Sequence, residues 1–323
     1  MEIKGKKIFI TGGAGFVGSH TADKLLEMDC SVTVYDNLKT GQSDIFLKDA
    51  KTNKDFKMVE GDILDLDKLK SEMDGHDFVF HLSANADVRG GLDNTRIDLE
   101  QNTIGTWNVL EAMKINNVKG IAFSSTSAMY GEPDKFPTPE NYNPTQTSLY
   151  GASKLAGEAM IQAFCEGFGI KSWIFRFVSL IGERYTHGVI FDFIKKLHSD
   201  PKELEILGDG EQKKSYLYIG DCVNAMVFAI QNADEKVNTF NLGNVEYMNV
   251  KDVANIIIEE MKLSDVKFKF TGGEKGWIGD APFVQLAVDR IQSLGWKPEV
   301  SIEDGIRKTA QYLLQNKELL DRR

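Results

Sequence analysis

The sequence predicts an α/β fold, with a Rossmann-type doubly wound parallel sheet and a smaller C-terminal α/β domain. Three observations predict it. Apolar strand-like runs alternate with helical patterns through the first half of the chain, a glycine-rich turn separates the first strand from the first helix, and strand ends carry small or polar residues. Such alternation is typical of parallel sheets, which bind ligands at the carboxyl ends of their strands. The 323 residues, 42% of them hydrophobic, fit about two domains.

Strand and helix patterns follow one another in order. Strands are expected at Lys7–Ile10, Ser31–Tyr35, Phe56–Asp62, Phe78–Leu82, Lys119–Ser124 and Trp173–Phe177, with helices between them at Ser19–Met28, Asp67–Met73, Glu100–Asn116 and Leu149–Phe168. The second half is less regular. It predicts a turn at Gly208–Gly210, a strand at Ser215–Ile219, and helices at Asp221–Asn232, Val250–Met261 and Thr309–Arg323. Asn249 is a suitable N-cap for the helix that follows it.

The glycine-rich turn predicts a dinucleotide site. The segment Thr11–Gly18 contains Gly12, Gly15 and Gly18, and the next strand leads to Asp36. In a strand–turn–helix unit these glycines allow the tight turn, the approach of a pyrophosphate and close helix–strand packing, while the helix N-terminus faces the phosphates. A carboxylate at the position of Asp36 accepts hydrogen bonds from an adenosine ribose and repels a 2′-phosphate. The pattern therefore favours NAD over NADP.

A tyrosine and a lysine open the helix expected at Leu149–Phe168. Tyr150 and Lys154 are four residues apart and share one helix face. A nearby ammonium and the cationic ring of oxidised NAD would both favour the phenolate and lower the pKa of Tyr150. The phenolate can then take a proton from a substrate hydroxyl while hydride leaves the carbon. The hydroxyl-rich end of the strand before it, Ser124–Ser127, could hold the reacting oxygen.

Charge and cysteine usage exclude several classes of partner. The net charge of −10 gives no sign of nucleic-acid or membrane-surface binding. Cys30, Cys165 and Cys222 form no C-x-x-C pair, which disfavours disulfides and zinc and fits a cytoplasmic location. No targeting segment or membrane span of ~18 apolar residues is expected, and the histidines show no metal-ligand spacing, so no metal is expected. His81, at a strand end, is interpreted as structural.

Together these segments resemble the extended short-chain dehydrogenase/reductase family, and within it the nucleotide-sugar epimerases of the UDP-glucose 4-epimerase type. The resemblance covers nearly the whole chain. It rests on Thr11–Gly18, Asp36–Leu38, Gly61–Ile63, His81–Ala84, Asn102, Ser124–Gly131, Tyr150 with Lys154, Gly208–Asp221 and Gly279–Pro282. It implies an NAD-dependent isomerase that inverts C4 of a UDP-sugar, with UDP-glucose and UDP-galactose as the first expectation.

The resemblance assigns the catalytic roles to three residues. Tyr150 removes the 4-OH proton, Thr126 is the catalytic hydroxyl, and Lys154 also bonds the nicotinamide ribose. The C4 hydride passes to tightly held NAD, the 4-keto sugar rotates about its phosphate linkage, and hydride returns to the other face. NAD contacts are implied for Gly12, Gly15, Phe16, Val17, Gly18, Asp36, Asn37, Leu38, Thr40, Gly41, Asp62, Ile63, Leu82, Ser83, Ala84, Asn102, Ser124, Ser125, Tyr150, Lys154, Phe177 and Val178.

The substrate side departs from the family pattern. Substrate contacts are implied for Thr126, Tyr150, Ser179, His187, Gly188, Val189, Leu207, Lys214, Trp277 and Asp280. Lys214 and Trp277 stand where arginines are common, Leu207 where an aromatic residue often stacks on uracil, and Ser179 where many 4-epimerases carry asparagine. Val284, near the position that limits N-acetylated sugars, is small. UDP-glucuronate 4-epimerase and UDP-N-acetylglucosamine 4-epimerase therefore stay open as alternatives.

Three other functions fit these motifs less well than 4-epimerisation does. Dehydratase activity is disfavoured because no acidic residue follows Thr126, and decarboxylation is disfavoured less firmly because a β-keto acid loses carbon dioxide spontaneously. A non-catalytic NAD-binding sensor would need the pocket but not Tyr150, Lys154 and Thr126.

The resemblance also implies an arrangement of domains and subunits. The NAD-binding domain is expected at 1–177 plus 221–244, and the nucleotide-sugar-binding domain at 178–220 plus 245–323. A homodimer is expected through a four-helix bundle formed by Glu100–Asn116 and Leu149–Phe168 of each subunit.

Overall fold

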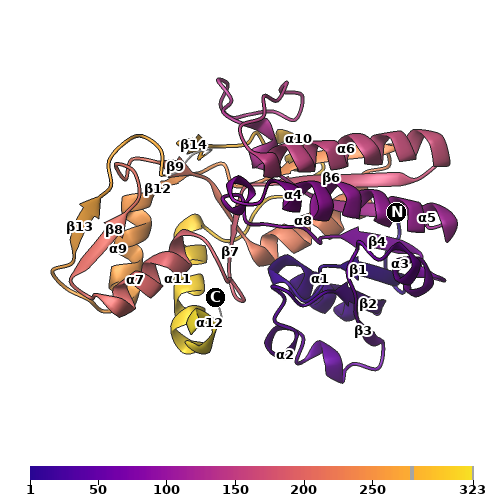
Figure 1. The fold of residues 1–323 in the computed structure, drawn as a ribbon, viewed down its shortest axis with the longest axis horizontal. Helices are drawn as coiled ribbons and strands as arrows, with labels where there is room; N and C mark the ends of the chain where they lie inside the picture. The colour runs from indigo at the N-terminus through magenta and orange to yellow at the C-terminus, as the bar shows by residue number, and fades with distance from the viewer. Residues whose placement is uncertain (277–279, 322–323) are drawn as a thin grey trace.

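The computed structural model describes residues 1–276 and 280–321. Within these residues its centre is a seven-stranded parallel sheet in the order β11-β6-β5-β4-β1-β2-β3 (Figure 1). The strands are β1 (Lys7–Thr11), β2 (Ser31–Asp36), β3 (Phe56–Glu60), β4 (Phe78–His81), β5 (Gly120–Thr126), β6 (Lys171–Phe177) and β11 (Val237–Leu242). The order reverses between β1 and β4, where ligands bind in such sheets. The doubly wound sheet is therefore confirmed.

Helices cover both faces of the sheet. One face packs on α1 (Phe16–Glu27) and α8 (Ile219–Asn232), and the other on α3 (Leu66–Met73), α5 (Gly105–Ile115) and α6 (Leu149–Phe168). Alternate residues of β6 serve the two cores, because neighbouring side chains of a strand point to opposite faces. Trp173 and Phe175 belong to the first apolar cluster, and Ile174 belongs to the second.

A third apolar cluster gathers the elements at the left of Figure 1. It joins α7 (Val189–Ser199), α9 (Val250–Glu260) and α11 (Ile302–Gln315) to the parallel pair β8 (Glu203–Ile206) and β13 (Lys267–Phe270). The short strands β7 (Ser179–Ile181), β9 (Lys213–Lys214), β10 (Tyr216–Tyr218), β12 (Met248–Asn249) and β14 (Phe283–Val284) connect this part to the cavity described below. The other short elements are α2 (Ser43–Phe46), α4 (Thr95–Ile97), α10 (Asp289–Gln292), α12 (Glu318–Asp321), η1 (Ala50–Thr52), η2 (Gly90–Leu92), η3 (Asp98–Ile104) and η4 (Ser127–Tyr130).

Side-chain caps mark the starts of three long helices, α6, α9 and α11. Asn249 accepts a hydrogen bond from the Asp252 N–H at the start of α9, which confirms the expected cap, and Ser148 accepts one from the Gly151 N–H at the start of α6. The helix expected at Thr309–Arg323 starts too late, and its expected last residue lies outside the described residues. Helix α11 begins at Ile302, where Ser301 is the cap, and ends at Gln315 before the short α12.

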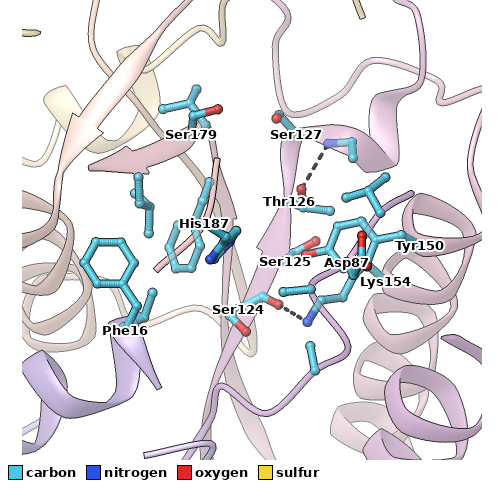
Figure 2. A pocket seen from close by; sticks show the side chains of 18 of the residues that line it. Phe16, Asp87, Ser124, Ser125, Thr126, Ser127, Tyr150, Lys154, Ser179 and His187 are labelled. Atoms are coloured by element: carbon cyan, nitrogen blue, oxygen red, sulfur yellow. Dashed lines mark hydrogen bonds between the residues drawn. The ribbon is translucent and has the colours of Figure 1, made fainter. Parts of the chain in front are cut away.

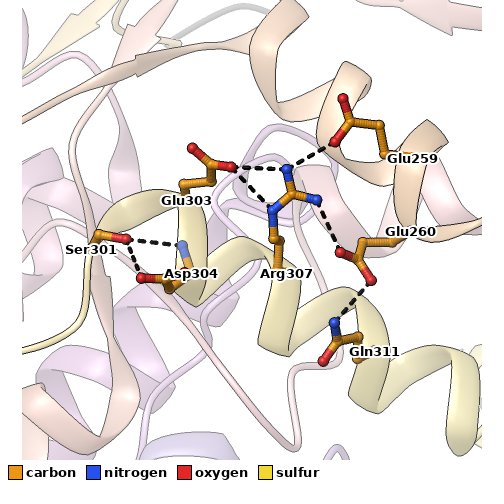
Figure 3. A network of polar contacts seen from close by, with 7 residues as sticks. All are labelled: Glu259, Glu260, Ser301, Glu303, Asp304, Arg307 and Gln311. Atoms are coloured by element: carbon orange, nitrogen blue, oxygen red, sulfur yellow. Dashed lines mark hydrogen bonds and ion pairs between the residues drawn. The ribbon is translucent and has the colours of Figure 1, made fainter.

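A polar network holds α11 against α9 (Figure 3). The Arg307 guanidinium bonds Glu259 at 2.8 Å and Glu260 at 3.0 Å on α9, and Glu303 at 2.8 Å on its own helix. Gln311, one turn further on, also donates to Glu260. The arginine therefore joins α11 to α9, two helices of the third apolar cluster, through charge as well as packing.

Candidate active site

A cavity of about 730 Å³ opens at the carboxyl edge of the sheet. Its walls come from the turns after β1, β2, β4, β5 and β6, from the first turn of α6, and from the segments around β9 and β14. The predicted site residues that line it are Gly12, Gly15, Phe16, Val17, Gly18, Asp36, Asn37, Thr40, Leu82, Ser83, Ala84, Ser124, Ser125, Thr126, Tyr150, Lys154, Phe177, Val178, Ser179, His187, Lys214 and Asp280. The structure thus brings most of the two predicted sets into one space.

The glycine turn is as tight as the sequence predicts. Gly12 has φ +72°, and a Cβ added to it would lie 2.7 Å from the Ser83 backbone at the end of β4. A Cβ on Gly18 would lie 2.2 Å from the Gly12 carbonyl oxygen. Among the residues that the structure describes, no side chain caps the start of α1. Backbone N–H groups there remain available to a phosphate, as a dinucleotide site requires.

Asp36 is fixed at the end of β2 by the turn around it. One carboxylate oxygen accepts a hydrogen bond from the Ala14 N–H and the other from the Leu38 N–H, both at 2.9 Å. Burial raises the pKa of Asp36, and these two bonds partly offset the rise. The carboxylate lies in the cavity beyond the glycine turn. Its place fits the ribose of an adenosine, so the residues at this end fit NAD.

The three side chains expected to be catalytic, Tyr150, Lys154 and Thr126, meet at the junction of β5 and α6 (Figure 2). Lys154 Nζ donates a 2.6 Å hydrogen bond to the Ser124 carbonyl oxygen. Tyr150 is partly buried and shares a hydrogen bond with Thr126, whose oxygen also accepts from the Ala128 N–H at 3.1 Å. Tyr150 and Lys154 therefore reach the same wall of the cavity, as their four-residue spacing predicts.

The proton affinities at this centre differ from the expectation. Burial raises the pKa of Tyr150 to about 12, against the hydrogen bond with Thr126, and the charge of Asp98 raises it further. Lys154 is not among the causes of this shift, because burial lowers its own pKa to about 7 while Glu158 and Asp98 raise it. The predicted lowering of the tyrosine pKa by the lysine is therefore not found in the chain alone. The positive charge would have to come from a bound cofactor.

A buried ion pair holds the end of β5 in place through Ser125. Arg176 on β6 pairs with Glu158 on α6 at 2.6 Å, and the Ser125 hydroxyl donates to Glu158 at 2.5 Å. Arg176 also donates to the Tyr130 hydroxyl at 2.7 Å. Ser125, expected to contact NAD, thus lines the cavity while its hydroxyl is held by Glu158.

Several expected contacts lie outside the cavity lining. These are Leu38, Gly41, Asp62, Ile63, Asn102, Gly188, Val189 and Leu207. Asn102 is buried in the π-helix η3, where it donates to Ser153 and accepts from the Asn85 N–H. Trp277, another expected contact, lies outside the described residues.

The far end of the cavity is polar and aromatic. Lys214 on β9 pairs with Asp280 at 2.5 Å, so both expected residues are present but bind each other. His187 stacks on Tyr185 with 5.9 Å between ring centroids. Phe136 and Phe283, which the sequence did not single out, also line the cavity, with their rings 4.5 Å apart.

Sequence reasoning missed further lining residues on irregular segments. They include Lys39, Gln42, Asn85, Asp87, Gln101 and Tyr185. Most follow a motif that was recognised, because the turns after β2 and β4 continue along the cavity wall. Phe136 and Phe283 come from separate loops, and only the folded chain brings them together.

The structure also shows the surroundings of His81 and of the three cysteines. His81 is fully buried, with Thr11 and Thr106 hydroxyls 2.8 Å from its two ring nitrogens, as a structural histidine requires. The three cysteines are free and buried. Across residues 1–276 and 280–321, no acid, histidine and cysteine group suits a metal, and no helix is long and apolar enough to cross a membrane.

Comparison with known proteins identifies the family. Residues 8–243 match the model of the NAD dependent epimerase/dehydratase family. A Methanocaldococcus jannaschii protein with the provisional name UDP-glucose 4-epimerase is 33% identical over 96% of this chain and 99% of its own. A crystal structure of UDP-galactose 4-epimerase is 35% identical, with a TM-score of 0.86 over 96% of this chain and 99% of that one. UDP-glucuronic acid 4-epimerase from Bacillus cereus, solved with UDP-glucuronic acid and NAD, is 27% identical, with a TM-score of 0.88 over 96% and 99%. The match covers both the sheet and the cavity that it carries, and the chain belongs to the NAD dependent epimerase/dehydratase family.

Proposed function

We propose that this chain is a UDP-sugar 4-epimerase whose first substrates are UDP-glucose and UDP-galactose. One observation carries the proposal. Tyr150, Lys154 and Thr126 line the same cavity as the glycine turn and Asp36, so a proton acceptor and a dinucleotide can meet one sugar carbon. A site that only senses NAD needs the glycine turn and Asp36 but does not need the three catalytic side chains.

Each residue has a distinct task at the reacting carbon. Bound NAD supplies a hydride acceptor and a positive ring charge. Tyr150 accepts the proton of the sugar 4-OH and returns it after the sugar has turned. Thr126 holds the reacting oxygen, and Lys154 holds the nicotinamide ribose. Glu158 and Ser124 keep the lysine in place, the first by charge and the second by its carbonyl oxygen.

Cofactor and substrate contacts are proposed at the two ends of the cavity. Gly12, Gly15, Gly18 and the N-terminus of α1 would hold the pyrophosphate of NAD, and Asp36 its adenosine ribose. At the other end Lys214 is the proposed partner of the substrate diphosphate. It supplies charge without the fork of an arginine. Because Lys214 is paired with Asp280, the substrate must share or displace that carboxylate.

Two related substrates remain alternatives. Val284 lines the cavity and leaves more room than a large side chain would, which favours UDP-N-acetylglucosamine as a second candidate. UDP-glucuronate is the third, because a family member of similar fold was solved with that ligand.

The proposed division of the chain follows the sheet. Strand β11 completes the sheet beside β6, which supports assigning 221–244 to the NAD-binding part with 1–177. Residues 178–220 and 245–323 are proposed to bind the nucleotide sugar. A homodimer through α5 and α6 is proposed on the exposed apolar side chains of these helices and η3, among them Leu99, Trp107 and Phe168.

Product analysis by NMR tests the proposal. The purified protein with added NAD is incubated separately with UDP-glucose, UDP-glucuronate and UDP-N-acetylglucosamine. We expect UDP-galactose from UDP-glucose. If only UDP-glucuronate or UDP-N-acetylglucosamine gives a C4-inverted product, that sugar becomes the first candidate substrate. Binding of NAD without inversion of any of the three would contradict the proposed function and favour the non-catalytic alternative.

A further inference from the structure

The turn after β4 brings a carboxylate to the side of the cavity that also carries Tyr150 and Lys154. Asp87 is exposed and lines the cavity, although no motif pointed to it. Figure 2 labels Asp87 on the α6 side of the cavity with Tyr150 and Lys154, across from Phe16. The place of this residue matters because the sugar must present its C4 to Tyr150.

Hydrogen bonds fix this turn against the first turn of α6. The Asn85 N–H donates a 2.7 Å hydrogen bond to the side-chain oxygen of Asn102, and the Asn85 side chain donates to Asp98 at 2.8 Å. Asn102 in turn donates to the Ser153 hydroxyl at 3.0 Å, and Ser153 donates to the Tyr150 carbonyl oxygen at 2.8 Å. The segment that carries Asp87 is therefore tied to the backbone of the proposed proton acceptor.

The Asp87 side chain is itself held in place. One carboxylate oxygen accepts a 3.1 Å hydrogen bond from the Gly90 N–H. Among the described residues, no lysine, arginine or histidine forms a salt bridge with Asp87. A second carboxylate, the buried Asp98, lies close enough for Asp87 to raise its pKa. The two acids place negative charge on this side of the reacting centre.

The cations that line the described part of the cavity have other partners. Lys39 pairs with Asp62 and Lys214 with Asp280. Lys154 donates to the Ser124 carbonyl oxygen. His187 lines the cavity as well, and no arginine lines it within residues 1–276 and 280–321. Within the described residues, Asp87 therefore adds to the cavity wall a negative charge that no ion pair neutralises, while the charges of Lys39 and Lys214 are paired with acids.

We infer that Asp87 is a specificity-determining residue that selects neutral hexoses over sugars with a C6 carboxylate. The inference rests on the proposed 4-epimerase function. C6 is attached to C5, the neighbour of the reacting C4, so a glucuronate that reaches Tyr150 brings its carboxylate to the same wall. Two carboxylates ~6–8 Å apart at an effective dielectric constant of about 40 repel by roughly a factor of six to ten in affinity. Salt weakens this repulsion.

Steady-state kinetics of NAD-loaded enzyme test the inference. The quantity is the ratio of kcat/KM for UDP-glucose to kcat/KM for UDP-glucuronate. We expect a ratio of about ten or more for the wild type, and a roughly tenfold smaller ratio for Asp87→Asn, which keeps the shape and removes the charge. Asp87→Ser is the second variant and should lower the ratio in the same direction.

Asp93→Asn is the matched control, because Asp93 is exposed, lies nearby in sequence and does not line the cavity. It should keep the wild-type ratio. A wild-type ratio near one, or a ratio that Asp87→Asn and Asp87→Ser leave unchanged, overturns the inference.

Failure of the proposed function would look different. If the wild type inverts neither sugar, the 4-epimerase assignment fails. The charge effect is then decided by the dissociation constants of the two nucleotide sugars for NAD-loaded wild type and Asp87→Asn. A preference for UDP-glucose that shrinks about tenfold in the variant supports the role of Asp87, and an unchanged preference refutes it.

Discussion

At the residue scale, burial sets the proton affinities of Tyr150 and Lys154, the proposed catalytic pair. Tyr150 has its pKa raised to about 12 and Lys154 has its pKa lowered to about 7, each chiefly because the charged form loses water. The tyrosine is therefore protonated at neutral pH in the chain alone. In the proposed mechanism, the cationic ring of bound NAD would lower the pKa of Tyr150, and proton transfer would then depend on cofactor binding.

Replacement of Tyr150 by phenylalanine separates catalysis from binding. Without the hydroxyl, the 4-OH proton has no acceptor, and we expect kcat to fall by about 10²–10⁴-fold. The affinity for NAD, measured by calorimetry, should stay within about twofold, because the glycine turn and Asp36 are untouched. Tyr142→Phe, which removes a hydroxyl that bonds Asp134 away from the cavity, is the control. An undiminished rate for Tyr150→Phe would refute the tyrosine mechanism.

His81 makes the fold sensitive to acid. Burial lowers its pKa to about 3, so the folded chain keeps it neutral while the unfolded chain protonates it near pH 6.5. The unfolded state then binds more protons, and stability falls as the pH drops below 6.5. The contribution lost between pH 7.5 and 5.5 is about 1.4 kcal/mol.

Urea unfolding at the two pH values measures this loss. His81→Gln keeps hydrogen-bonding groups near Thr11 and Thr106 without a titrating ring, so its stability should fall by about 1.4 kcal/mol less than that of the wild type over the same interval. Equal losses in both proteins would show that His81 does not contribute.

At the element scale, the unit β1–turn–α1 depends on the absence of a side chain at Gly18. A Cβ there would lie 2.2 Å from the Gly12 carbonyl oxygen, so Gly18→Ala must push the helix away from the turn. We expect at least tenfold weaker NAD binding, measured by calorimetry, with a loss of stability of about 1–3 kcal/mol. Gly167→Ala is the control.

The control separates helix propensity from crowding. A Cβ on Gly167 in α6 would have no atom within 4 Å, so this change should leave NAD binding unaltered and raise stability by up to about 1 kcal/mol. If both variants bind NAD as the wild type does, the close packing at Gly18 is not required.

Local signals explain which elements the sequence could predict. The bounds of α6 were predicted correctly because Ser148 caps its start and Gly169, with φ +63°, follows its end. Ser301 caps α11 equally well, but the helix expected from the sequence begins only at Thr309, after the actual start at Ile302. The π-helix η3 was expected only as part of a longer helix, because nothing in the residues Asp98–Ile104 distinguishes the wider turn.

The same division holds for the site. Gly12, Asp36, Tyr150 and Lys154 were found because strand, turn and helix fix their relative positions through short-range rules. Asp87 was not predicted as a site residue. It lies on a turn whose course depends on hydrogen bonds from Asn85 to Asn102 and Asp98, which are distant in sequence. Contacts of this kind are tertiary and leave no periodic pattern.

At the scale of the whole molecule, exposed apolar side chains on η3, α5 and α6 predict a dimer. Leu99 is 50% exposed, Trp107 43% and Phe168 42%. Light scattering should give twice the mass of one chain for the wild type and a shift to monomer for Trp107→Glu, because a buried unpaired carboxylate is costly.

The control for the dimer carries the same change on another surface. Phe270 on β13 is 41% exposed and lies outside the proposed bundle, so Phe270→Glu should keep the wild-type mass. A monomeric wild type, or a dimer that Trp107→Glu does not weaken, would contradict the proposed four-helix interface.

Isotope tracing tests the central claim, that the sheet and the cavity together move a hydride off C4 and back. UDP-glucose labelled with deuterium at C4 is incubated in ordinary water with NAD-loaded enzyme, and UDP-galactose is analysed by NMR. The account predicts UDP-galactose that keeps deuterium at C4, because the hydride stays on a cofactor held in the closed site. A product with ordinary hydrogen at C4, or no C4 inversion at all, would contradict it.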